Sequence, residues 1–134
     1  MVYHAAVRLS AAGLLLAGLL LSACAAAPRA VRPAPVEPAE VLERFAGAAE
    51  DGRWEDAWAL LSARWRARTT PDRLASDWRV SGPVGPEATA RVLALLRSGA
   101  LLAVGPREAV LAVAEGRRAR LVSEEGGWRV DALE

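Results

Sequence analysis

Carboxylates are the only side chains in residues 24–134 that could supply acid–base chemistry. This stretch contains no His, Lys or Tyr, and Cys24 is its single cysteine. It therefore lacks the groups that activate a serine or cysteine nucleophile, and the amine that forms a Schiff base. It also lacks the imidazoles and paired thiolates that zinc and most transition metals prefer. We expect no catalytic residue, no metal site and no cofactor.

Two carboxylate pairs are the candidates for acid–base catalysis, namely Asp72 with Asp77 and Glu55 with Asp56. A glycosidase-like hydrolase needs two carboxyl groups at a defined separation, one of them with a raised pKa. Sequence spacing supplies neither condition, and acids are frequent in this chain. A small-pocket enzyme, either an isomerase or dehydratase or a carboxylate-dependent hydrolase, is therefore kept only as the alternative to a non-catalytic domain.

An apolar run precedes Cys24. Residues 9–21 are apolar apart from Ser10, and they follow a short basic start that carries His4 and Arg8. Thirteen helical residues cover about 20 Å, whereas a bilayer's hydrocarbon core is about 30 Å thick. A basic start, a short apolar run and then small residues are typical of a signal peptide rather than a membrane span.

The letters LSAC at residues 21–24 resemble the lipobox of bacterial lipoproteins. This resemblance implies cleavage between Ala23 and Cys24, removal of segment 1–23 and acylation of Cys24. Two or more acyl chains anchor a protein stably, because each buried methylene adds about 0.8 kcal/mol. Ala25 stands where lipoproteins of the inner membrane often carry Asp, so the resemblance favours the outer membrane, facing the periplasm. An ordinary secretory signal is the alternative.

Residues 24–38 are predicted to be a tether, because four prolines oppose a helix and favour extended geometry: Pro28, Pro33, Pro35 and Pro38. Residues 25–38 reach at most about 43 Å. The rest, 39–134, is long enough for one small domain. The chain has 17 cationic and 16 acidic side chains, so no basic excess points to nucleic acid.

We expect the N-terminal part of this domain to be helical. Apolar residues at helical spacing predict helices over 38–51, 53–67 and 86–98. Thr70 followed by Pro71 predicts the capped start of a further short helix. The helix over 53–67 would carry one apolar stripe, made of Trp54, Ala57, Trp58, Leu61 and Trp65.

Short runs separated by glycine-containing turns follow, and they predict hairpins over 101–104, 108–114, 117–123 and 128–133. Alternation in the third run places Ala119 and Leu121 on one face. In the last run it places Trp128, Val130 and Ala132 on one face. The expected fold class is α+β, with N-terminal helices packed on a small C-terminal antiparallel sheet.

Two segments resemble the nuclear transport factor 2-like superfamily, especially its small bacterial lipoproteins of unknown function. Residues 41–78, which include the letters AWALLS, resemble its N-terminal helices, and EEGGWRVDAL at 124–133 resembles its last hairpin. The resemblance implies a cystatin-like cone with an open-ended pocket, and pairing of two copies through their sheets. Residues 80–104 depart from the family pattern, which indicates a truncated sheet.

The candidates for a ligand or partner surface are the tryptophans of the expected helix over 53–67 and the arginines around its end, namely Trp54, Trp58, Trp65, Arg64, Arg66 and Arg68. Tryptophans at helical spacing could equally form core, and the arginines could form a solvated face. We expect a lipid-anchored envelope protein whose domain has a non-catalytic binding or accessory role. Its partners would be the bilayer, through Cys24, and another envelope protein or a small apolar ligand.

Overall fold

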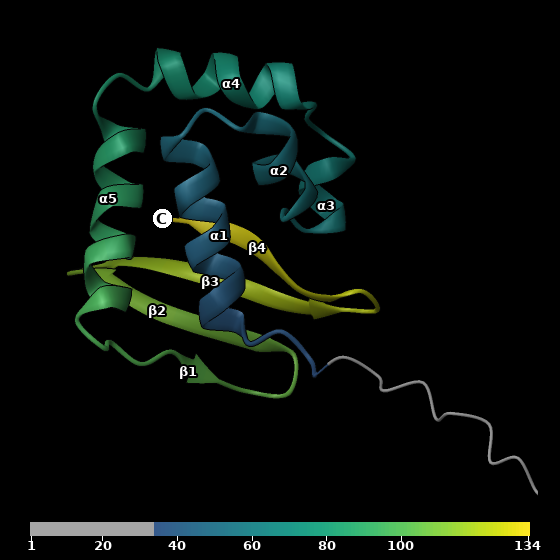
Figure 1. The fold of residues 1–134 in the computed structure, drawn as a ribbon, viewed down its shortest axis with the longest axis vertical. Helices are drawn as coiled ribbons and strands as arrows, with labels where there is room; N and C mark the ends of the chain where they lie inside the picture. The colour runs from purple at the N-terminus through teal and green to yellow at the C-terminus, as the bar shows by residue number, and fades with distance from the viewer. Residues whose placement is uncertain (1–33) are drawn as a thin grey trace, which may run out of the picture. The chain divides into compact units, whose positions relative to one another are not determined.

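The computed structural model describes residues 34–134 (Figure 1). The predicted signal peptide, Cys24 and most of the predicted tether lie outside the described residues. Five helices come first and four strands follow: α1 Pro38–Glu50, α2 Trp54–Ala59, α3 Ala63–Arg66, α4 Pro71–Val80, α5 Val84–Arg97, β1 Ala103–Val104, β2 Glu108–Ala114, β3 Arg117–Glu124 and β4 Gly127–Leu133. In the part that the structure describes, no helix combines the length and the apolar composition needed to cross a membrane.

Helix α1 forms where the apolar spacing predicts it. Pro38 occupies its first turn, where a missing N–H costs nothing. Its buried face, at helical spacing, includes Leu42 and Phe45, and this face packs against α5 and β4. The helix ends before Gly52, which adopts a positive φ of 69°.

The predicted continuous helix over 53–67 is wrong, because the chain forms α2, an extended link and then α3. The Ser62 N–H donates to the Val130 carbonyl at 2.8 Å, and the Val130 N–H donates to the Leu60 carbonyl at 2.9 Å. The link therefore runs parallel beside β4. Local helix propensity is outweighed here by two tertiary contributions. The link pairs with the free edge of β4, and Leu61 becomes buried, with 7% of its surface exposed. The five-residue apolar stripe does not exist on one helix.

Helix α4 begins as predicted, with the Thr70 hydroxyl accepting a hydrogen bond of 3.2 Å from the Arg73 N–H. Helix α5 begins at Val84, two residues before its predicted start. The break between the two helices is therefore confined to residues 81–83.

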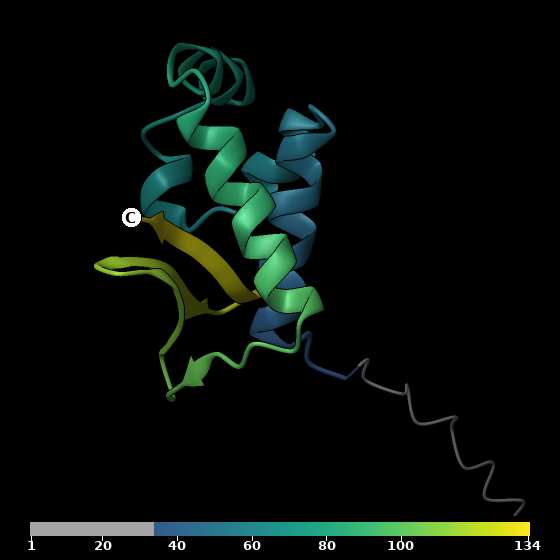
Figure 2. The same cartoon turned by 90° about the vertical axis from the view of Figure 1, so that its left-hand side faces the viewer.

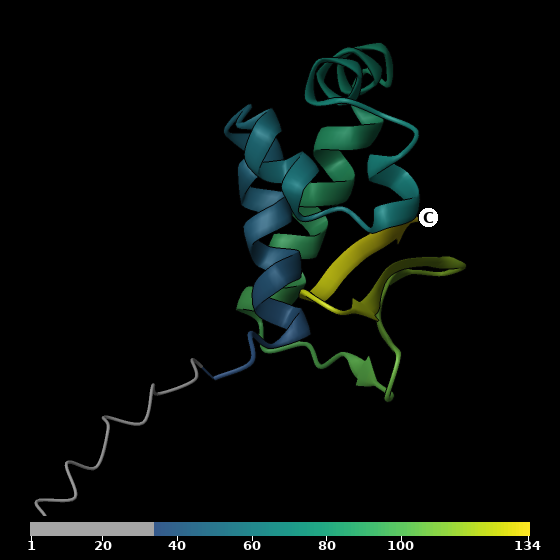
Figure 3. The same ribbon diagram turned by 90° about the vertical axis from the view of Figure 1, so that its right-hand side faces the viewer.

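The four predicted runs form one antiparallel sheet with strands in the order β1-β2-β3-β4. Helices α1 and α5 lie against one face of this sheet, and the sheet curves without closing (Figures 2 and 3). The sheet's part of the core is Ala109, Leu111, Ala119, Leu121 and Val130. The α+β class with N-terminal helices packed on an antiparallel sheet is thus confirmed, as is the shared face of Ala119 and Leu121.

A β-bulge changes the face that the end of β4 presents. Val130 lies opposite Leu121 and Ala132 lies opposite Arg120, so Asp131 is an extra residue between them. Leu133, not Ala132, lies opposite the buried Ala119. The prediction that Ala132 shares the face of Trp128 and Val130 is therefore wrong. A bulge depends on pairing with the neighbouring strand, and strict alternation along one strand cannot reveal it.

Candidate functional site

A cleft of about 480 Å³ lies between helix α4 and the C-terminal half of strand β4. Figure 3 shows the end of β4 lying below α4. The residues that line the cleft are Phe45, Leu61, Trp65, Arg68, Thr69, Arg73, Leu74, Asp77, Trp78, Val130, Asp131, Ala132 and Leu133. This volume lies within the range of about 300–1,000 Å³ that small-molecule sites occupy.

Apolar side chains from three parts of the chain form the interior of this cleft. Phe45 comes from α1, and Leu74 and Trp78 stand four residues apart on α4, so they share a helix face. Leu133 comes from the end of β4. The cleft exists because α4 lies over the end of β4 without filling the space below it.

The rim of the cleft is polar, and within residues 34–134 one of its two arginines has no carboxylate partner. The Arg73 Nε lies 2.9 Å from the Asp77 Oδ1, so these two charges compensate each other. Arg68 is exposed, and it has no carboxylate within ion-pair distance among residues 34–134. An apolar interior beside an unpaired guanidinium suits a molecule with an apolar body and an anionic group.

The Asp131 side chain, which is 6% exposed, is the only buried ionisable group among the described residues. Its carboxylate accepts hydrogen bonds from Ser62 Oγ at 2.7 Å, from the Arg64 guanidinium at 2.8 Å and from the Arg120 guanidinium at 2.6 Å. Its backbone carbonyl accepts a hydrogen bond from the Trp65 indole N–H. A general base needs a free oxygen within reach of substrate. This carboxylate is occupied and instead fixes the link between α2 and α3 to the sheet.

The structure brings two of the six predicted surface residues, Trp65 and Arg68, into the cleft. Trp65 is 41% exposed, so its ring is open to a ligand. Trp54 instead packs on Trp78 with ring centroids 5.8 Å apart, and the Trp58 indole donates to the Thr69 carbonyl at 2.8 Å. Both of these rings are half-buried.

The other two predicted arginines have structural partners. Arg64 binds Asp131, and its guanidinium lies 5.7 Å from the ring centroid of Trp65. Arg66 lies 3.6 Å from the Glu124 carboxylate. Neither arginine is free to define a separate anion site, and the predicted surface of six residues is therefore not continuous.

The structure does not bring either nominated carboxylate pair together in the cleft, since Glu55, Asp56 and Asp72 are absent from its lining. Asp77 lines the cleft in its pair with Arg73, whereas Asp72 lies outside the cleft lining. Asp56 binds Arg53 on the surface, and this hydrogen bond raises the pKa of the Arg53 guanidinium. Residues 34–134 contain no group of three or more His, Cys, Asp or Glu that could hold a metal ion.

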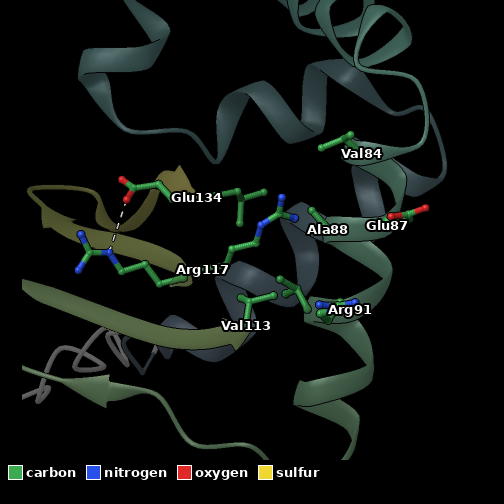
Figure 4. Close-up of a pocket in the computed structure, with 10 residues that line it drawn as sticks. Val84, Glu87, Ala88, Arg91, Val113, Arg117 and Glu134 are labelled. Atoms are coloured by element: carbon green, nitrogen blue, oxygen red, sulfur yellow. Dashed lines mark ion pairs between the residues drawn. The ribbon is translucent and has the colours of Figure 1, made fainter. Parts of the chain in front are cut away.

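A second hollow, of about 170 Å³, lies between helix α5 and the sheet (Figure 4). Arg91 lines it from α5 and Val113 from β2, and Arg118 pairs with Glu134 at its edge at 3.5 Å. Its volume falls below the usual range for small-molecule sites. The larger cleft is therefore the stronger candidate.

Sequence reasoning missed the cleft residues Phe45, Trp78 and Leu133. Their only signal was apolar periodicity, which predicts burial but does not say which buried face borders an empty space. Comparison of this chain with protein-family models, with curated proteins and with solved structures found no match. The lipid anchor, the outer-membrane location and the homodimer therefore stay predictions.

Proposed function

We propose that this chain is a lipid-anchored envelope protein whose domain binds, without catalysis, a small amphipathic molecule in the cleft between α4 and β4. The observation that carries the proposal is the combination of a cleft of about 480 Å³, an apolar interior and the unpaired Arg68 at its rim. The ligand would place its apolar body against Leu74 and Trp78 and its anionic group near Arg68.

Binding is favoured over catalysis by the state of the acids around the cleft. Asp131 is held by three side chains, and Asp77 is paired with Arg73. The Asp131 carboxylate offers no free oxygen to a substrate, and the Asp77 carboxylate is exposed to solvent beside its paired cation rather than enclosed at a reacting atom. A small-pocket enzyme therefore has no specific observation in its favour.

The lipid anchor and the finer fold assignment belong to the same proposal. The anchor is supported by the LSAC letters at residues 21–24, which stand behind a short apolar run. A cone of the nuclear transport factor 2-like type is supported by residues 41–78 and 124–133. It is supported as well by helices lying on one face of an open antiparallel sheet.

A fluorescence titration tests the cleft. The chain from residue 24 onward, with Cys24→Ser, contains the whole described core and carries no acyl group. The probe is an undecanoic acid that carries a dansyl group, and its methyl ester is the uncharged comparison. Energy transfer from tryptophan to dansyl reports binding, because Trp65 and Trp78 line the cleft.

We expect saturable binding of the acid and about tenfold weaker binding by Arg68→Gln, since a hydrogen bond to a charged group contributes about 1.5 kcal/mol. Arg79→Gln is the matched control, because Arg79 is exposed on α4 but does not line the cleft. The ester should bind both variants alike. Absence of saturable binding of either probe by the unsubstituted domain would contradict the proposal.

A further inference from the structure

The connection between α5 and β2 exposes apolar side chains that the domain itself does not cover. Leu101 is 91% exposed and Val104 is 58% exposed. Residues 97–107 contain no acid, and Arg97 and Arg107 bracket the apolar part. Both arginines are exposed. We call these four residues the base surface.

The base surface lies at the end of the domain where the chain enters. Residues 34–37 lead into the first turn of α1 at the same end as β1 and the end of α5 (Figures 1 and 2). Helix α4, which borders the cleft, lies at the opposite end (Figure 1). The described chain therefore begins at the end of the domain that carries β1 and the end of α5, and away from α4.

We propose that the base surface rests on the lipid bilayer that holds the acylated Cys24, so that the cleft faces away from the membrane. This inference rests on the lipid anchor of the proposed function. The ten residues from Cys24 to residue 34 span at most about 36 Å. Residue 34 therefore stays within about 36 Å of the residue that the proposal anchors in the bilayer.

The chemistry of the base surface matches a lipid interface. Leucine and valine gain free energy when they leave water for the boundary between headgroups and acyl chains, and arginines meet lipid phosphates. Glu37 lies at the same end, and Glu40 in the first turn of α1 is paired with Arg44. Because Glu37 offsets part of the charge of Arg97 and Arg107, apolar insertion contributes more than net charge to the contact, and salt should weaken it little.

The test uses the complete lipidated protein in vesicles of phosphatidylethanolamine and phosphatidylglycerol. Acylation consumes the sulfur of Cys24, so a cysteine introduced elsewhere is the only reactive thiol. Leu101→Cys carries a nitrobenzoxadiazole label at the base surface. Val80→Cys is the matched control, because Val80 is an exposed apolar residue, 84% accessible, at the end of α4. Vesicles with nitroxide-labelled acyl chains quench a label only where it meets lipid.

We expect quenching at residue 101 to exceed quenching at residue 80 by about threefold or more. Equal quenching at the two positions would overturn the inference. A label at residue 101 that is shielded from water but not quenched by lipid would also overturn it, because a protein partner would then cover the surface. Flotation of the vesicles is measured first. Protein that does not float with the lipid would contradict the lipid anchor, and it would therefore also contradict the docking of the base surface on the bilayer.

Discussion

The Ser62 hydroxyl donates a hydrogen bond of 2.7 Å to the Asp131 carboxylate, across 69 positions of the chain. Ser62 belongs to the link between α2 and α3, and Asp131 is the extra residue of the β4 bulge. Arg64 and Arg120 complete the set of partners. One buried carboxylate thus joins the helical part of the chain to the sheet.

Asp131→Ala should lower the free energy of unfolding by about 3 kcal/mol, because it leaves Arg120 and Ser62 without their shared acceptor. This loss of stability lies at the low end for a buried ion pair, because the side chain of Arg64 is half-exposed and water can hydrate its guanidinium in the variant. Urea unfolding followed by tryptophan fluorescence measures the change. Glu125→Ala, at an exposed acid, should stay within about 0.5 kcal/mol of the original domain. Equal stability of the two variants would contradict a role for this network.

Leu121→Ala should cost about 2–5 kcal/mol, because Leu121 is fully buried between the sheet and the helices. Leu101→Ala should change the free energy of unfolding by less than about 0.5 kcal/mol, because Leu101 touches mainly solvent. The comparison also matters for the base surface. A large cost for Leu101→Ala in the absence of lipid would mean that this side chain serves the fold rather than the membrane.

Gly85→Ala should disturb the wall of the cleft. An added Cβ would lie 2.8 Å from Ser81 Oγ and 3.0 Å from the Trp78 ring, so that ring must move. The expected result is weaker probe binding and an altered tryptophan emission, despite the better helix propensity of alanine. Gly47→Ala is the control in α1, where nothing lies within 4 Å of the new Cβ. It should stabilise the domain by about 0.5–1 kcal/mol and leave probe binding unchanged.

Thr70→Ala should destabilise the domain by about 1 kcal/mol, because the Thr70 hydroxyl caps the first turn of α4. Loss of the cap should also loosen α4 and raise the rate of amide hydrogen exchange at the Arg73 N–H. Ser76→Ala, in the same helix, removes a hydroxyl from the helix interior and should be neutral or slightly stabilising. If both variants behaved alike, the cap would contribute nothing.

Cys24→Ser should abolish acylation and leave the precursor unprocessed, because the predicted lipid bond needs a sulfur at this position. Incorporation of radiolabelled palmitate and the apparent mass on a gel measure both effects. Equal labelling of the two forms would end the anchor hypothesis, but it would leave the cleft proposal standing, since the titration uses protein without lipid.

Local signals were sufficient to predict much of the fold. Proline at the start of α1, the Thr70 cap and the glycine-containing turns act within a few residues, and all of them are present in the structure. The break at Leu61 could not be predicted in this way. Its cause is the free edge of β4, almost seventy residues later, which accepts and donates the backbone hydrogen bonds that a helix would otherwise make.

The residues of the cleft were only partly predictable, because the cleft also depends on contacts between segments that are distant in the sequence. Trp65 and Arg68 were identifiable because tryptophan and arginine are residue types that often bind ligands. Phe45 and Leu133 resemble any other core residue in the sequence. They border the cleft only because the folded chain leaves space below α4, and the placement of α4 depends on contacts with distant elements.

The parallel pairing of the link at Leu61 with Val130 also bears on the order of folding. The backbone partner of residues 60–62 lies in β4, the last strand of the chain. A fragment that ends before residue 127 leaves the Ser62 N–H and the Leu60 carbonyl without this partner, and unpaired strand edges can pair with other extended chains. We therefore expect such a fragment to aggregate and to be cut by protease, whereas the complete domain should resist cleavage.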